Sequence, residues 1–359
     1  MKVLHSLPFL LSLLLCDSTF AAAPTLVMIT VDVESYSKGN PDLQIWGKQP
    51  DGTHGIQRMM DMLDAHGLKG TFYLNVYEAA KFGESDIANV ARTIHSRGHD
   101  LQLHTHPGPM FGSNYMQQAS LEKQVEILKR GKELIRQWTG KTVIAHRAGD
   151  FAANLDTLKA CQLEGLPIDS SFSSILGYTG LSHQLTGTNL PREIGGVLEL
   201  PITEYTQVRL VNWESLRDLD IEASSFDEMV KAIRQLRDAG FPTVTILMHS
   251  FSFVRDGKAH PDVEQRFDNL LGFLAAEPGV KVVSVSEFYT EWITKLSALP
   301  QGDNLIPFTG PWLMYRRAWE DFKGWKNILV AVIPPAMLFV MGAITIGWRQ
   351  KKNKITPTK

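Results

Sequence analysis

The sequence predicts an α/β protein in which parallel strands, each followed by a helix, form a closed or nearly closed barrel. Short β-branched apolar runs alternate with segments of helical periodicity from Thr25 to about Thr294, without an internal linker or repeat. The chain has 359 residues, and one large barrel domain with terminal appendages fits that length.

Each predicted element rests on a local pattern of residues. Apolar β-branched runs predict strands, helical periodicity predicts the segments between them, and Gly67, Gly98 and Gly240 are typical of helix ends. The predicted strands are 25–34, 70–76, 100–106, 142–147, 166–171, 197–202, 243–250 and 280–285. The predicted helices are 55–66, 85–97, 117–138, 154–163, 225–239 and 262–276.

The composition excludes several classes of protein. Hydrophobic residues make up 44% of the chain and charged residues 21%, which excludes a disordered protein. A formal net charge of −2 is too small for a nucleic-acid surface, so no nucleic-acid partner is expected. A disulfide scaffold is excluded because Cys16 lies in a segment expected to be removed, which leaves Cys161 without a partner.

The two ends of the chain indicate where it works. Residues 1–23 resemble a secretory signal peptide, with an apolar run and three alanines before Pro24. Residues 327–348 are predicted to span a membrane, because the uncharged run Ile328–Trp348 has 21 residues, or roughly 30 Å of helix. We therefore expect a domain at 24–300 outside the cytoplasmic membrane, a juxtamembrane stalk at 301–326 and a cytoplasmic tail at 349–359.

Carboxylates and histidines end the first and third predicted strands, and barrel enzymes build their active sites at such strand ends. Asp32 and Glu34 lie two residues apart and therefore on one face, as expected for a base and a metal ligand. His104 and His106 share a face in the same way, at a spacing that suits one divalent ion.

Two further strand ends bring an arginine and a histidine to the same rim. Arg147 leaves an apolar strand, which is costly unless it meets a carboxylate or an anionic substrate. His249 ends the strand 243–250, where it could donate a proton to a reacting oxygen. Together the four strand ends predict a metal-dependent hydrolase.

The order of these motifs resembles the polysaccharide deacetylases of carbohydrate esterase family 4, the NodB homology domain, over roughly Thr25 to Thr294. The resemblance implies a distorted (β/α)7 barrel that uses a divalent metal, usually zinc, to remove acetyl groups from N-acetylated sugars. The segments that carry it are Thr30-Val31-Asp32, Gly98 to Thr105, Arg147-Ala148-Gly149, Asp169-Ser170-Ser171 and Leu247-Met248-His249.

The resemblance also implies a role for each strand-end residue. Asp32 would be the general base and Arg147 the residue that orients it. His104 would be a metal ligand, and His249 the acid that protonates the leaving amine.

The sequence departs from the family pattern at two ligand positions. Val33 stands where the family has a second, metal-binding aspartate, and Gly108 stands where it has a second histidine. The sequence is similar to a divergent branch of envelope and lipopolysaccharide-type deacetylases with Asp-x-Glu and His-x-His motifs. We expect Asp32 or Glu34, with His104 and His106, to surround one metal, and the division of labour between the carboxylates stays open.

The predicted function is the removal of N-acetyl groups from an envelope or exported polysaccharide or a lipid-linked glycan, with polysaccharide export proteins as partners. One alternative is a non-catalytic module that binds glycans or assembles an export system. The other is a metallohydrolase of the amidohydrolase type, although such enzymes carry the histidine pair on their first strand. Trp46, Tyr115 and Phe253 lie in loops and are candidates for stacking on sugar rings.

Overall fold

The computed structural model describes residues 23–35, 39–175, 178–181, 189–210, 213–255, 257–292 and 305–313. The predicted membrane span 327–348 and tail 349–359 lie outside these ranges, as does all of the predicted signal peptide except its last residue. Within them, no helix combines the length and the apolar character that crossing a bilayer requires.

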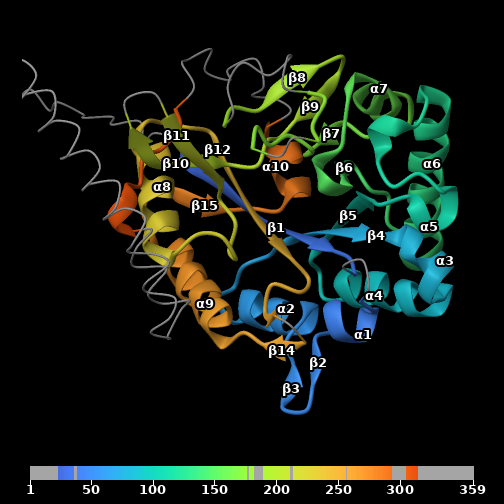
Figure 1. The fold of residues 1–359 in the computed structure, drawn as a ribbon, viewed down its shortest axis with the longest axis horizontal. Helices are drawn as coiled ribbons and strands as arrows, with labels where there is room; N and C mark the ends of the chain where they lie inside the picture. The colour runs from blue at the N-terminus through green and yellow to red at the C-terminus, as the bar shows by residue number, and fades with distance from the viewer. Residues whose placement is uncertain are drawn as a thin grey trace, which may run out of the picture.

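A nine-stranded sheet forms the centre of the fold, and helices surround it (Figure 1). Its strands run in the order β12-β1-β4-β5-β6-β7-β9-β8, with β15 beside the start of β1. All pairs are parallel except that of β8 with β9. The strands are β1 (Thr25–Val33), β4 (Thr71–Asn75), β5 (Asp100–Thr105), β6 (Ala145–Ala148), β7 (Ile168–Asp169), β8 (Arg192–Ile194), β9 (Val197–Glu199), β12 (Thr243–His249) and β15 (Val280–Val282).

The helices fall where the periodicity predicts them, within a few residues at each end, except for four that were not predicted. The predicted six are α2 (Ile56–Ala65), α4 (Glu84–Ser96), α6 (Leu121–Thr139), α7 (Leu155–Leu163), α8 (Phe226–Asp238) and α9 (Pro261–Ala276). The others are α1 (Pro41–Gln44), α3 (Ala79–Phe82), α5 (Gly108–Phe111) and α10 (Val285–Trp292), and single 3₁₀ turns occupy Val76–Glu78, Met116–Gln118 and Gly149–Phe151.

The predicted α/β class is confirmed, but the regular barrel is only half formed. The ladder of described strands ends at β8 on one side and β12 on the other, so the sheet is a curled half-barrel. Irregular backbone bridges the gap: the amide of Thr203 donates to the carbonyl of Thr245, and that of Ile221 to the carbonyl of Leu247, both at 3.1 Å. These segments have no regular strand pairing, so the ladder does not close, and the curled sheet is consistent with the distorted barrel that the resemblance implies.

Three short hairpins were also not predicted, because their ladders are too short or too polar to show a clear period of two. They are β2 (Lys48–Gln49) with β3 (Gly52–Thr53), β10 (Glu204–Leu210) with β11 (Trp213–Asp218), and β13 (Val254–Arg255) with β14 (Lys258–Ala259).

Part of the predicted stalk is attached to the domain. Phe308 forms a parallel bridge with Thr206 of β10. From α8, Gln235 Nε2 donates to the carbonyl of Phe308 at 3.0 Å and Lys231 Nζ donates to the carbonyl of Thr309 at 2.7 Å. Residues 305–309 are therefore fixed against β10 and α8.

Alternation along β1 sends its side chains into two different cores. Val27, Val31 and Val33 belong to the large core between the sheet and the helices. Leu26 and Met28 belong to a smaller core inside the curl of the sheet. Because Asp32 follows the second set in register, its carboxylate lies on the inner face, at the carboxyl end of the strand.

Gly131 marks where α6 approaches the sheet too closely for a larger residue. A methyl group there would lie 2.6 Å from Tyr77 Oη and 2.7 Å from Leu103 Cδ1. Inside α9, a methyl group on Gly272 would meet nothing closer than His66 Cε1 at 3.6 Å.

Gly131→Ala is expected to lower the free energy of unfolding by about 1–3 kcal/mol, the usual cost of overpacking. Gly272→Ala is the control, and it should leave that free energy unchanged or raise it by up to about 1 kcal/mol, because alanine is the better helix former. Urea denaturation followed by circular dichroism measures both. Equal effects at the two sites would contradict the close approach of α6.

Candidate metal and catalytic site

The parallel register brings the predicted site residues to one edge of the sheet. Asp32 of β1 pairs with His249 of β12 on one side and with Tyr73 of β4 on the other. On β5, His104 is in register with Asn75 of β4. Residues far apart in the sequence thus end at one level on neighbouring strands.

Glu34, His104 and His106 form a group whose ligand atoms all lie within 4.8 Å of one another. Glu34 Oε2 is 2.7 Å from His106 Nε2 and 3.5 Å from His104 Nε2. Two imidazoles and one carboxylate are a donor set that catalytic zinc sites use, with a fourth position left open. Asp32, predicted as a base or a ligand, is not in this group of three.

The hydrogen bonds of His104 fit a metal ligand. Its Nδ1 lies 2.9 Å from the backbone carbonyl of Arg147, to which it donates. Its Nε2 is buried without a hydrogen-bond partner and faces Glu34. A backbone acceptor at one ring nitrogen is the usual way to fix the tautomer of a ligating histidine, so a cation would satisfy an otherwise unpaired atom.

The charges of the group support each other. Burial alone would raise the pKa of Glu34, but the nearby imidazoles of His106 and His104 hold it well below its usual range. Burial alone would lower the pKa of His106, but Glu34, with help from Asp150 and Asp32, raises it to about 9. The group therefore favours a positive charge beside Glu34, for which a bound metal would compete with a proton.

Asp32 and Arg147 form a buried ion pair on the inner face. Arg147 Nη1 donates to Asp32 Oδ1 at 2.7 Å, and the two side chains are 0% and 4% exposed. Arg147 also donates through Nε to the carbonyl of Ser170 at 3.0 Å and through Nη2 to the Ser170 hydroxyl at 2.9 Å. Its guanidinium lies over the Tyr73 ring, 4.3 Å from the centroid, so it fixes the direction of the carboxylate.

Glu222, which the sequence analysis missed, holds His249. His249 Nδ1 lies 3.3 Å from Glu222 Oε1, and the Ser252 hydroxyl donates to the same oxygen at 2.7 Å. Burial lowers the pKa of His249, but the hydrogen bond and charge of Glu222, with Asp32 and Glu34 beyond, raise it to about 10. His249 is therefore an imidazolium that can donate a proton. No motif surrounds Glu222 in the sequence.

Glu78 is a second residue that the sequence analysis missed. Its Oε1 accepts from the amide of Ser35 at 2.6 Å and from Asn75 Nδ2 at 3.4 Å. Burial, with the nearby charge of Glu34, raises the pKa of Glu78 to about 7. It supports the segment that carries Glu34.

A second cluster of potential ligands lies on the outer face, under α7. His146 Nδ1 is 2.5 Å from Asp169 Oδ1, and Cys161 Sγ is 3.6 Å from the same nitrogen. His146 Nε2 lies 2.9 Å from the Thr105 hydroxyl. Burial and the charge of Asp169 raise the pKa of Glu199 well above its usual range, so Glu199 holds a proton beside Asp169. These contacts make a hydrogen-bonded chain across β5, β6, β7 and β9.

The three aromatic residues singled out in the sequence lie in different surroundings. Phe253 is buried and packs on Phe267 with centroids 5.7 Å apart, so its proposed contact with sugar was wrong. Trp46 is half-buried beside Phe82 in a groove at α1 and α3. Tyr115 is partly exposed, near Asp150.

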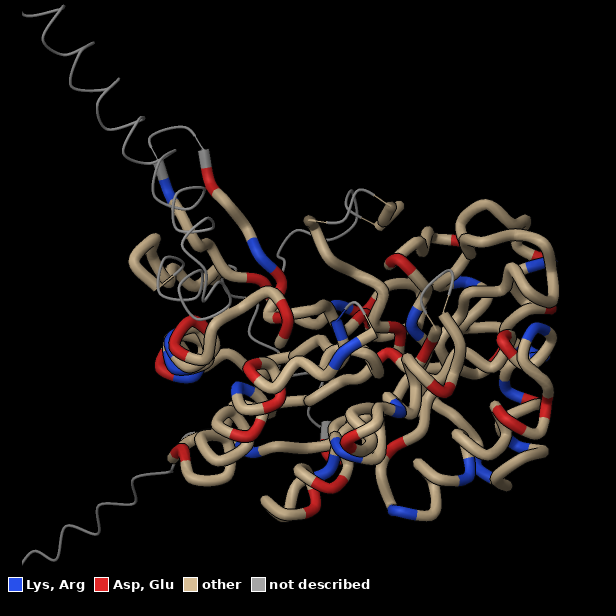
Figure 2. The backbone as a smooth tube through the Cα atoms, turned by 60° about the horizontal axis from the view of Figure 1, so that its bottom comes forward, with Lys and Arg blue, Asp and Glu red and all other residues tan. Residues whose placement is uncertain are grey.

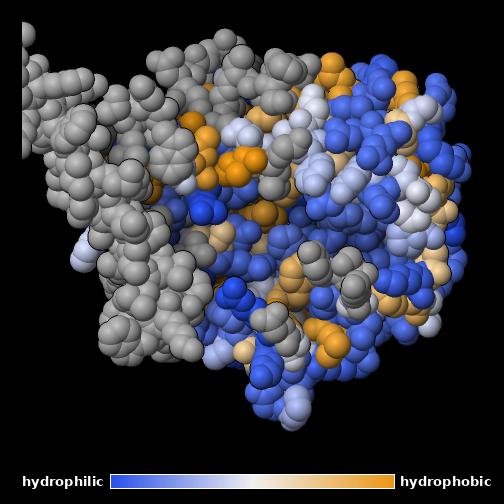
Figure 3. All heavy atoms as spheres, in the orientation of Figure 1, coloured by the Kyte–Doolittle hydropathy of each residue, from blue (hydrophilic) through white to orange (hydrophobic). Residues whose placement is uncertain are grey.

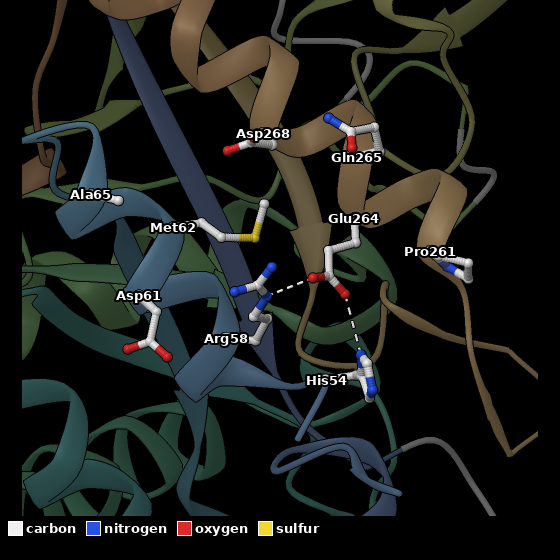
Figure 4. A pocket seen from close by; sticks show the side chains of 9 residues that line it. All are labelled: His54, Arg58, Asp61, Met62, Ala65, Pro261, Glu264, Gln265 and Asp268. Atoms are coloured by element: carbon white, nitrogen blue, oxygen red, sulfur yellow. Dashed lines mark hydrogen bonds and ion pairs between the residues drawn. The ribbon is translucent and has the colours of Figure 1, made fainter. Parts of the chain in front are cut away.

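A groove between α2 and α9 is lined by charged residues that already pair with each other (Figure 4). Glu264 accepts from Arg58 at 2.5 Å and lies 3.2 Å from His54 Nδ1. Acidic and basic residues are interspersed along the described backbone, and apolar surface occurs in separate patches (Figures 2 and 3). The groove between α2 and α9 does not contain the strand-end residues described above.

Comparisons with known proteins agree with the motifs. Residues 25–167 match the family model of polysaccharide deacetylases, so the resemblance predicted from the motifs is confirmed for this part of the chain. The divergent branch is not resolved by this match. No curated protein sequence matches the chain significantly.

Solved structures share the fold at low sequence identity. A protein from Mycobacterium smegmatis assigned as a polysaccharide deacetylase has a TM-score of 0.51 at 16% identity, over 80% of this chain and 94% of that one. A 4-α-glucanotransferase from Thermococcus litoralis has a TM-score of 0.51 at 11% identity, over 75% of this chain and 40% of that one. At such identities the likeness shows the fold alone.

Gly149 lies against the candidate ligand His106. A methyl group at this position would overlap the imidazole ring of His106. A methyl group on Gly108 would instead contact the side chain of Asn114, which is flexible and can move away. Gly149→Ala is therefore expected to displace His106 and to lower metal affinity by at least about tenfold, the smallest usual cost of disturbing a ligand's support.

Gly108→Ala is the matched control from the same rim, and it should bind metal as the unmodified chain does. Competition with a chromogenic chelator measures affinity, and circular dichroism verifies the fold. Equal affinity in the two variants would exclude His106 as a ligand.

Proposed function

We propose that this chain, which has a polysaccharide deacetylase domain at residues 25–167, is a metal-dependent hydrolase that removes N-acetyl groups from an envelope or exported polysaccharide or a lipid-linked glycan. The observation that carries the proposal is the group Glu34, His104 and His106 on the same strand-end rim as the Asp32–Arg147 pair and His249. A ligand set, a base and an acid are the parts that amide hydrolysis requires.

Glu34, His104 and His106 would hold the metal, and the donor chemistry favours zinc. Such a metal supplies a Lewis acid that polarises the acetyl carbonyl and lowers the pKa of water. The unpaired Nε2 of His104 is the observation that supports binding. Asp32 stays outside the group of three, which leaves its carboxylate available as the base.

The residues around the reacting amide have separate proton-transfer roles. Arg147 orients Asp32, so that its carboxylate accepts the proton of the attacking water. His249, held as an imidazolium by Glu222, donates a proton to the leaving amine. Base and acid are on adjacent strands, β1 and β12, at paired positions.

The extracytoplasmic location is part of the proposal and rests on the sequence. The signal-like segment 1–23 and the apolar segment 327–348 support a domain tethered outside the cytoplasmic membrane. The attachment of residues 305–309 to β10 and α8 would keep the domain close to such a tether. Polysaccharide export proteins are the partners expected there.

The decisive experiment measures bound metal and released acetate in the full-length chain. His104→Ala removes one of three ligands and is expected to lower both metal affinity and acetate release by at least about 100-fold. His95→Ala, at an exposed position of α4, is the control and should change neither. Elemental mass spectrometry and an acetate assay with N-acetylchitotetraose give the two readouts.

Each result of this experiment has a different meaning. Metal without acetate release would favour another hydrolytic reaction. Absence of metal at equilibrium with micromolar zinc would overturn the enzyme and favour a non-catalytic glycan-binding module. Full metal content in His104→Ala would overturn the ligand assignment.

The pH dependence should report the acid. Because the pKa of His249 is raised, His249 stays protonated at neutral pH. Activity should fall as the pH rises through that pKa and the proton is lost. Glu222→Gln removes the charge that raises this pKa, so the alkaline limb of the kcat/KM profile should move to lower pH. Glu214→Gln, in the exposed part of β11, is the control. An unmoved limb in Glu222→Gln would exclude His249 as the acid.

A further inference from the structure

Two tyrosines from distant loops stack beside the candidate metal group. The rings of Tyr115 and Tyr178 have centroids 5.4 Å apart and an angle of 20° between their planes. Tyr115 comes from the loop after β5 and Tyr178 from the loop after β7. Tyr178 is 51% exposed, so aromatic surface remains available to a ligand.

Both tyrosine loops are attached to the same turn after β6. The amide of Gln117, two residues after Tyr115, donates to the carbonyl of Ala152 at 3.0 Å. The amide of Gly180, two residues after Tyr178, donates to the carbonyl of Ala153 at 2.7 Å. The stacked pair is therefore held by backbone hydrogen bonds as well as by its own contact.

The same turn presents a carboxylate that lies near both Tyr115 and His106. Asp150 and Phe151 have φ values of 52° and 54°, a left-handed conformation that costs about 1–3 kcal/mol for each non-glycine residue. The Asp150 side chain is 51% exposed, and its Oδ2 lies 4.0 Å from His106 Nδ1. Its charge raises the pKa of the Tyr115 hydroxyl, which reflects their closeness.

We propose that Tyr115, Tyr178 and Asp150 form a subsite for a pyranose ring of the glycan, next to the sugar whose acetyl group is removed. An aromatic face matches the apolar C–H face of a pyranose, and a carboxylate accepts hydrogen bonds from its hydroxyls. This inference rests on the proposed function and narrows it: the substrate is a glycan chain of at least two rings.

Tyr178→Ala in the metal-loaded full-length chain tests the subsite. Because an aromatic contact contributes about 0.5–1.5 kcal/mol, KM for N-acetylchitotetraose should rise about two- to twelvefold while kcat changes little. Hydrolysis of 4-nitrophenyl acetate, which has no sugar ring, should not change. Asp150→Asn should also raise KM for the tetrasaccharide without lowering bound metal.

Two variants serve as controls. Tyr178→Phe keeps the ring and should bind the tetrasaccharide as the unmodified chain does. Leu163→Ala removes a comparably exposed apolar side chain from α7 and should have no effect. Unchanged KM in Tyr178→Ala, or equal losses on both substrates, would overturn the subsite.

Direct binding of N-acetylchitotetraose, measured by calorimetry, separates this inference from the proposed function. Binding that weakens in Tyr178→Ala, without acetate release by the unmodified chain, would support the subsite and overturn the deacetylase. Acetate release by the unmodified chain, with unchanged affinity for the tetrasaccharide in Tyr178→Ala, would support the deacetylase and overturn the subsite. Absence of binding to the unmodified chain would overturn the subsite.

Discussion

The buried guanidinium of Arg147 is the constraint on which the site depends. A fully buried guanidinium is tolerated only when its N–H groups have hydrogen-bond acceptors. Removal of one partner of a buried ion pair such as Arg147–Asp32 costs about 3–5 kcal/mol. Arg147 meets this condition through Asp32 on β1, Ser170 after β7 and the Tyr73 ring on β4. Three strands must therefore be in register before the charge is neutralised. The candidate base consequently acquires a fixed direction as part of the formation of the sheet.

The outer face of the same strands carries a second polar layer. His146 precedes Arg147, and Asp169 precedes Ser170, so alternation sends one residue of each pair outward and the next inward. The outward pair is 2.5 Å apart at His146 Nδ1 and Asp169 Oδ1, under α7. The Thr105 hydroxyl, between His104 and His106 in sequence, lies against His146 Nε2. A displacement of either layer would therefore be transmitted to His104 and His106, the candidate ligands.

The sequence was sufficient to predict the strands and helices, whose apolar residues recur at a regular spacing. All eight predicted strands and six predicted helices have counterparts, because apolar period and glycine ends reflect local burial and backbone freedom. Glu222, Glu78 and Tyr178 could not be predicted, because their relevance arises from contacts with residues distant in sequence. Glu222 contacts His249, 27 positions away, Glu78 contacts Ser35, 43 positions away, and Tyr178 contacts Tyr115. The position of the gap in the sheet could not be predicted for a similar reason, since irregular backbone bridges it. The roles of the rim residues remain predictions.

The two departures from the family pattern become consistent when the faces of the strands are considered together. Val33 is fully buried in the core between the sheet and the helices, where a carboxylate would lack partners. Glu34, one residue further, reaches the other side and lies 2.7 Å from His106. A histidine at position 108 would stand at the start of α5, whereas His106 keeps the spacing of two that places it near His104, with ring centroids 5.0 Å apart. Glu34 stands one residue after the family's carboxylate position and His106 two residues before its histidine position. Together they preserve a group of three potential ligands, so the two changes compensate each other.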